Sequence, residues 1–179
     1  MANIDWAKLE EDNKGNFKDY ADNGKHTVKC IGVEIKEVGT NGSVIQKFQF
    51  EDTDVQYPTA DHWLSFKNDN WRQWHNKELM VFLGASEENA KKAIEMCEGK
   101  DGKDAIVKAY EQTYKKLLAK KPEVEIEVWA DGKYSRADFT SNKVRLSRPD
   151  DKKPESNDDI LSDAEDVTDE ISDDDIPFN

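Results

Sequence analysis

The sequence predicts a mainly β fold with a helical insertion (α+β), and three observations carry this prediction. Apolar and polar residues alternate through most of 26–66 and again through 124–140, which is typical of strands with one buried face. Between them, at about 68–121, apolar residues recur at helical spacing. The length of 179 residues suits one ordinary domain.

The elements follow from local patterns along the chain. In the first strand the apolar side chains occupy even positions up to Cys30 and odd positions from Ile31, a change of phase that a β-bulge beside Gly32 would produce. Ser86 is a good N-cap for a helix, and Pro122 ends the last one. After a polar N-terminal arm at 1–23, the expected elements are strands at 26–38, 44–52 and 61–66, helices at 68–83, 86–98 and 104–120, and two or three further strands. Two of these lie at 124–129 and 133–140, and a last alternating segment at 143–146 could be the third.

The order of these elements indicates one domain at 24–148. A five-stranded barrel with helices between the third and fourth strands is typical of the oligonucleotide/oligosaccharide-binding (OB) barrel. An α+β sandwich fits the same order nearly as well. In either fold, spacing places Phe48, Phe50, Trp71 and Trp74 in the core.

Charge is distributed very unevenly. The formal net charge is −13, yet residues 149–179 contain thirteen acidic and two basic side chains, which leaves the rest of the chain at −2. This tail has too few apolar residues to offset its ordering entropy, so we expect it to be disordered. It either keeps the protein soluble or uses the apolar residues near its tip, Ile176 and Phe178, to hold a partner.

Composition excludes several classes of protein. No apolar stretch is long enough to cross a membrane, and the start at Met1 lacks a secretory signal. The two cysteines, Cys30 and Cys97, are therefore expected to be reduced thiols in a cytoplasm.

The sequence does not favour an enzyme. His26, His62 and His75 form no metal-binding spacing, and Asp61-His62 has no accompanying nucleophile motif. Phosphate-binding glycine loops are absent from the sequence as well. We therefore expect no catalytic residue, no cofactor and no bound metal.

Single-stranded nucleic acid is the ligand that the strands favour. Aromatic faces stack on bases, and cations along a groove neutralise phosphates. Strand alternation places residues of both kinds on outward positions, although Trp129 and Tyr134 could equally pack against the helices. The candidate binding residues are Lys47, Trp63, Trp129, Tyr134, Arg136, Lys143, Arg145 and Arg148.

The acidic tip resembles that of bacterial single-stranded DNA-binding proteins. It consists of Asp173, Asp174, Asp175, Ile176, Pro177 and Phe178. In that family an OB barrel binds DNA and the tip recruits replication and repair enzymes, so the resemblance implies that these six residues bind such partners. One departure is that Asn179 follows Phe178, whereas the family's phenylalanine carries the terminal carboxylate.

The body resembles a different group, the phage-encoded single-stranded DNA-binding proteins of replication modules. The similar stretches are 24–29, 63–72 with 82–84, and 125–128. This resemblance implies a protein of a phage replication or recombination module that coats single-stranded DNA and engages phage or host enzymes through its tail.

Two other functions stay open at this point. The protein could be an adaptor or DNA mimic whose acidic tail occupies a basic partner surface, or a metal-dependent nuclease. The oligomeric state is open too, with a homo-oligomer among the alternatives.

Overall fold

The computed structural model describes residues 4–13, 18–40 and 42–144. Its helices span slightly more residues than its strands, so the fold is α+β. The elements are α1 (Trp6–Asn13), β1 (Gly24–Val38), β2 (Ser43–Phe50), β3 (Ala60–Leu64), α2 (Asp69–Phe82), α3 (Glu87–Glu98), α4 (Lys103–Leu118), β4 (Glu123–Asp131) and β5 (Tyr134–Phe139).

The five strands form a closed barrel in the order β1-β2-β3-β5-β4. All neighbouring strands are antiparallel except β3 and β5, which pair in parallel at Ala60 and Ala137. β1 closes the barrel, because its first part pairs with β4 and its second part with β2. The expected five-stranded barrel is confirmed, and so are the helices between the third and fourth strands.

A bulge in β1 lies where its pairing changes from β4 to β2. The register shifts between Cys30 and Gly32, at the position where the sequence predicts it. Ile31 is the extra residue and is 40% exposed, so the inward phase resumes at Val33 and not, as expected, at Ile31 itself. A side chain at position 32 would meet the Gln49 Oε1 atom at 3.0 Å, so the exposed Gln49 side chain would have to shift slightly to admit any residue larger than glycine.

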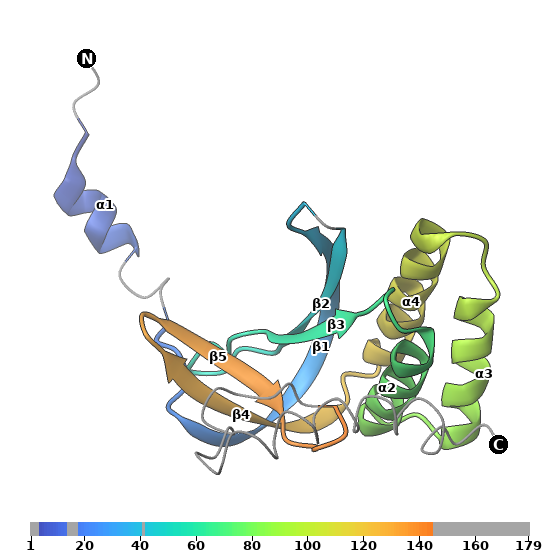
Figure 1. Cartoon of the computed structure of the whole chain (residues 1–179). Coiled ribbons are helices and arrows are strands. Elements are labelled where there is room, and N and C mark those ends of the chain that lie inside the picture. Colours follow the sequence, from blue (N-terminus) through green and yellow to red (C-terminus); the bar gives the residue numbers. More distant parts are fainter. Residues whose placement is uncertain (1–3, 14–17, 41, 145–179) are drawn as a thin grey trace, which may run out of the picture.

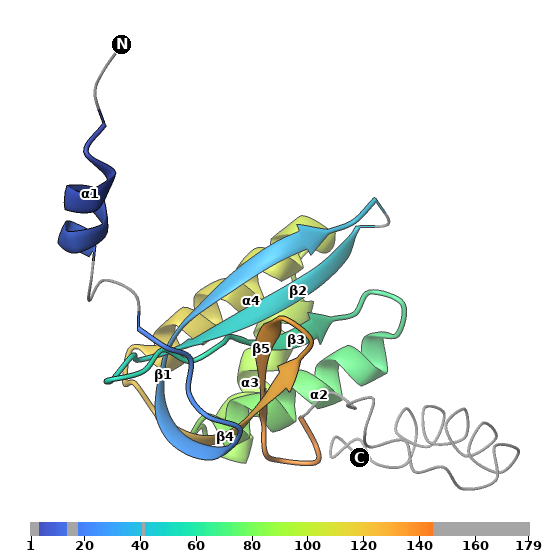
Figure 2. The same ribbon diagram turned by 90° about the vertical axis from the view of Figure 1, so that its left-hand side faces the viewer.

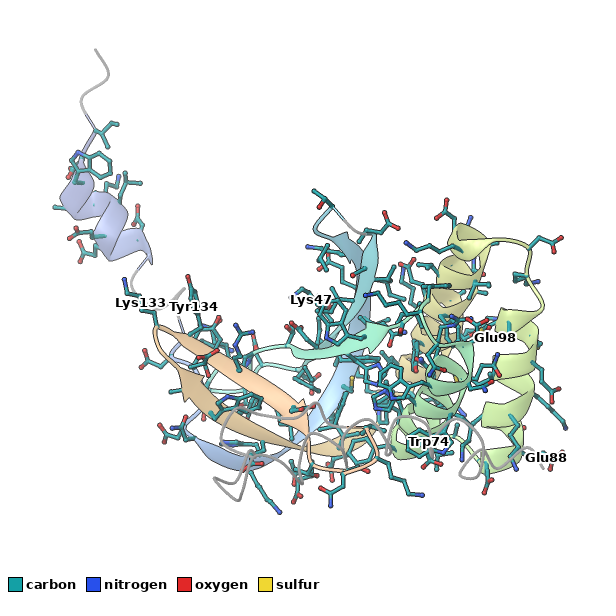
Figure 3. All side chains as sticks on the ribbon, in the orientation of Figure 1. Lys47, Trp74, Glu88, Glu98, Lys133 and Tyr134 are labelled. Carbon is teal, nitrogen blue, oxygen red and sulfur yellow. The ribbon has the colours of Figure 1, made fainter. Side chains whose placement is uncertain are left out.

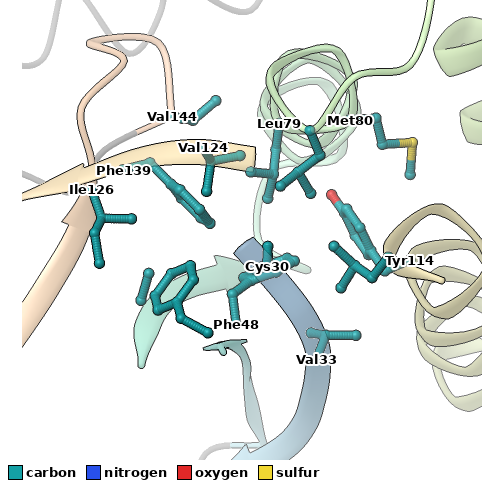
Figure 4. Close-up of a cluster of buried hydrophobic side chains, with 14 of the residues drawn as sticks. Cys30, Val33, Phe48, Leu79, Met80, Tyr114, Val124, Ile126, Phe139 and Val144 are labelled. Carbon is teal, nitrogen blue, oxygen red and sulfur yellow. The ribbon is translucent and has the colours of Figure 1, made fainter. Parts of the chain in front are cut away.

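The barrel interior continues into the helices without a boundary. Phe48 is fully buried, and its ring packs edge to face on Tyr114 of α4 and Phe139 of β5, at centroid separations of 5.2 and 5.5 Å. Figure 4 shows Leu79 and Met80 of α2 close to these rings. The structure confirms that Phe48 and Phe50 belong to the core.

Helices α2, α3 and α4 lie together on one side of the barrel (Figures 1 and 2). Asn68 caps α2 by accepting a hydrogen bond from the Trp71 amide, and Ser86 caps α3 in the same way from Asn89. The helical insertion begins and ends within about two residues of the expected positions. Trp71 and Trp74, however, are only partly buried and pack on the ring of His75, so placing them in the core was wrong.

The two ends of the described chain differ from expectation in detail. The N-terminal arm contains α1, which projects away from the barrel (Figure 1), and Tyr20 forms a single bridge with Gln56. Lys143 lies in a turn after β5, where the Val144 amide donates to the Ser141 carbonyl at 3.1 Å, and Val144 is buried. Among the described helices, none is long and apolar enough to cross a membrane.

Candidate nucleic-acid interface

The first group of candidate residues lies on the outer face of β2 and β3. Lys47 pairs with Asp61 across the ladder, and its Nζ is 3.2 Å from Asp61 Oδ2. Trp63 lies opposite Ile45, and its side chain is 38% exposed while Ile45 is buried. The alternation expected for β3 is confirmed, and Lys47 of β2 faces outward as expected, but Ile45 on the same face of β2 is buried. This face offers one cation and one accessible indole.

The second group lies on the outer face of the β4–β5 hairpin. Trp129 pairs with Arg136, and Tyr134 pairs with Asp131 next to the turn. Tyr134 is 70% exposed, whereas Trp129 is half-buried. Figure 3 shows Tyr134 and its neighbour Lys133 at the tip of this hairpin, at the opposite end of the barrel from α2, α3 and α4. The phenol ring is therefore free to stack on a base.

The parallel pair of Ala60 and Ala137 joins these two groups. Because β3 and β5 are neighbours there, the outer faces of β2, β3, β5 and β4 follow one another around the barrel. Lys47 and Trp63 lie on one side of this junction, and Trp129, Tyr134 and Arg136 lie on the other. Five of the eight candidate residues thus belong to four adjoining strands.

The other candidates do not join this surface in the described structure. Lys143 lies in the turn after β5, and its Nζ is 3.5 Å from Glu78 Oε2 of α2. Arg145 and Arg148 lie outside the described residues, as does the whole acidic tip from Asp173 to Phe178.

Each described candidate cation has a carboxylate partner. Lys47 pairs with Asp61, Arg136 with Asp131 at 2.7 Å, and Lys143 with Glu78. A phosphate must therefore replace a carboxylate at each of them. Such ion pairs at the surface are worth only about 0–1 kcal/mol each, so the exchange is inexpensive. Alternation along single strands could not identify these partners, because each comes from another strand, the far side of a turn or a helix.

Asp61 and His62 point to opposite sides of the barrel wall and so form no catalytic pair. His62 is fully buried, and its Nδ1 donates to Gln46 Oε1 at 3.0 Å. Gln46 in turn donates to Asn76, which also accepts from the Tyr114 hydroxyl at 2.7 Å. Burial lowers the pKa of His62, and the adjacent His75 lowers it further, so the imidazole is neutral.

Potential metal and redox groups are few in the described part of the chain. No cluster of three or more histidine, cysteine, aspartate or glutamate side chains there could hold a metal ion. Cys30 and Cys97 are both buried free thiols, as expected. Burial raises the pKa of Cys30 to about 12, which keeps it protonated.

Sequence reasoning missed an aromatic and basic groove beside Trp63. The loop after β3 supplies Phe66 and Lys67, and the first residue of α4 supplies Lys103. Trp63 and Phe66 are three residues apart and Lys67 follows directly, so the signal in the sequence was two aromatic residues next to a lysine. Comparison of the chain with family models, curated proteins and solved structures finds no match.

Proposed function

We propose that this protein binds single-stranded DNA without catalysing a reaction, as part of a phage replication or recombination module. The observation that carries the proposal is the closed barrel with strand order β1-β2-β3-β5-β4 and helices between β3 and β4. This arrangement is consistent with an OB barrel, a fold that binds oligonucleotides on strands 2 and 3 and on the loops joining strands 1–2 and 4–5. Trp63 and Tyr134 are exposed in those two regions.

Binding combines base stacking with exchange of ion partners. Exposed rings at Trp63 and Tyr134 accept bases of any sequence, because every base has a π-face. Phosphates replace Asp61 at Lys47 and Asp131 at Arg136, and the released carboxylates return to water. The protein therefore binds with little sequence preference and with an affinity that falls as salt rises.

A titration of fluorescently labelled (dT)₃₀, followed by anisotropy at several salt concentrations, tests this function. We expect saturable binding, quenching of tryptophan fluorescence and weaker affinity at higher salt. A double-stranded competitor should displace the labelled strand poorly. Lack of binding at 50 mM salt would overturn the proposal.

One observation favours the second candidate, a protein-interaction adaptor or DNA mimic. The three described candidate cations are already paired, and the outward residues of β4 include Glu123, Glu125 and Glu127. An adaptor of this kind would ignore (dT)₃₀ and bind a basic partner. The nuclease alternative is tested by adding Mg²⁺ and examining the length of the oligonucleotide on a gel, because only a nuclease shortens the DNA strand.

The acidic tip is proposed to recruit replication or recombination enzymes. Apolar anchors at Ile176 and Phe178 would enter a pocket, while the three aspartates steer the encounter. Pull-downs from infected cells with the full chain and with Phe178→Ala test this part. Loss of specific partners with unchanged (dT)₃₀ affinity supports recruitment, and retention of every partner refutes it.

A further inference from the structure

A groove of about 420 Å³ lies where the β1–β2 hairpin, the end of β3 and the start of α4 meet. Its volume is within the range of small-molecule sites. It adjoins the β2–β3 face directly, because Trp63 belongs to both. The groove is lined by Gly42, Ser43, Val44, Trp63, Leu64, Ser65, Phe66, Lys67 and Lys103.

Two cations contact the Phe66 ring in the wall of the groove: the Arg72 guanidinium and Lys103, whose Nζ lies 5.6 Å from the ring centre. Arg72 is buried, and its guanidinium lies 4.4 Å from the Phe66 ring centre. The same guanidinium donates to the Ser65 carbonyl at 2.8 Å and makes a two-pronged ion pair with Glu98 at 2.9 and 2.7 Å. The β3–α2 loop is therefore tied to α3, and a planar ligand would meet a wall that needs no reorganisation.

The groove also has a local excess of positive charge. Lys103 donates to Glu37 Oε1 at 2.8 Å and to the Gly42 carbonyl, so it is neutralised and holds the hairpin against α4. Lys67 is exposed, and among the described residues it forms no ion pair. It is thus a cation at the groove that need not release a carboxylate in order to meet a phosphate.

We propose that this groove binds one nucleotide of the DNA strand, with its base against Trp63 and Phe66 and its phosphate at Lys67. The inference rests on the proposed function and extends it. The bound DNA would then extend beyond the barrel surface to the start of α4, and the helical insertion would take part in binding. An aromatic pair next to an unneutralised cation matches a nucleotide better than an apolar peptide, which would leave Lys67 without a partner.

Photo-crosslinking of the full chain to (dT)₃₀ that carries 5-iodouracil locates the base. We expect a crosslink on the tryptic peptide 48–67, which contains Trp63 and Phe66. Salt titrations of Lys67→Gln then test the phosphate contact. The slope of log affinity against log salt should become shallower by about 0.7, the value for one phosphate on a single strand.

Lys116→Gln is the matched control, since Lys116 is an exposed lysine on α4 that lines a different groove. It should leave the slope unchanged. If (dT)₃₀ binds, but Lys67→Gln behaves like Lys116→Gln and crosslinks fall only on the β4–β5 hairpin, the groove inference is overturned and the proposed function stands. If the unmodified chain does not bind (dT)₃₀, the proposed function itself fails and this inference fails with it.

Discussion

Asp61 is directly opposite Lys47 in the β2–β3 ladder, with its Oδ2 3.2 Å from the lysine Nζ and its Oδ1 accepting a hydrogen bond from Thr59. This second contact holds the carboxylate in place. A phosphate approaching Lys47 must compete with a positioned negative charge on the same face. The pair therefore sets how strongly this part of the barrel attracts DNA.

Replacing Asp61 by Asn should raise affinity for (dT)₃₀, because Lys47 then meets the phosphate without a competitor. A surface pair is worth at most about 1 kcal/mol, so the expected gain is up to about fivefold at low salt. Lys47→Ala should lower affinity instead. Anisotropy titrations of both variants provide the measurement, and weaker binding by a folded Asp61→Asn protein would remove Lys47 from the interface.

Tyr134→Ala should weaken DNA binding without destabilising the fold. The ring is 70% exposed, so its removal should change the free energy of unfolding by less than about 0.5 kcal/mol. If a base stacks on it, the binding free energy should fall by about 1–3 kcal/mol. Trp129→Ala, at a half-buried position, should lower stability as well. Urea denaturation beside the DNA titration separates the two effects, and unchanged affinity in Tyr134→Ala would exclude stacking there.

Glu98→Gln should destabilise the protein substantially. Glu98 neutralises the buried guanidinium of Arg72 and also accepts from the Tyr110 hydroxyl at 2.6 Å. Burial by itself lowers the pKa of Arg72, but hydrogen bonds and charge attraction from Glu98 and Asp69 outweigh burial and give a net increase. Breaking a buried pair on one side costs about 3–5 kcal/mol. Glu95→Gln, at an exposed position on the same helix, is the control and should unfold at the wild-type urea concentration.

Stability should fall in mild acid because of His75. Burial lowers its pKa to about 4 in the folded protein from 6.5, although Glu78 and the carbonyls of Val144 and Lys143 oppose this change. Between these values the unfolded chain binds more protons. The contribution of neutral His75 to the free energy of unfolding is therefore fully present above pH 6.5. It is lost as the pH falls through about 4, and the total loss is on the order of 3 kcal/mol.

Denaturation in urea between pH 7.5 and 4.5 measures this loss. His75→Phe should show a shallower dependence of unfolding free energy on pH than the natural chain. His62, also buried and with a lowered pKa, contributes in the same direction and should leave a residual slope in that variant. Equal slopes in the two proteins would mean that His75 is not protonated on unfolding.

Patterns within single elements predicted much of the fold. The phase change beside Gly32, the Ser86 cap and the burial of Phe48 all depend on neighbours a few residues away. Whether a further strand begins at Lys143 could not be decided from the sequence, because a pattern of four residues is too short to separate a strand from a turn with one buried side chain; the structure places Lys143 in a turn.

The candidate site was harder to predict because its chemistry depends on contacts between elements. Alternation correctly placed Lys47 and Trp63 outward but gave no sign of the carboxylate opposite Lys47. Nothing in the local sequence pattern marks Arg72 as a buried ion-pair residue. Its partner Glu98 lies on another helix, and only the packing of α2 against α3 brings the two together.

The hydrogen bonds that join Gln46 and His62 of the barrel to Asn76 and Tyr114 of the helices have a consequence for modularity. An excised barrel would leave the buried amide of Gln46 without its partner Asn76, and it would lose the Tyr114 ring that packs on Phe48. Helices α2, α3 and α4 therefore could not be removed or exchanged without destabilising the barrel. Barrel and helices should fold and unfold as a single cooperative unit, and a shortened version of this protein would need a redesigned interior before it could exist.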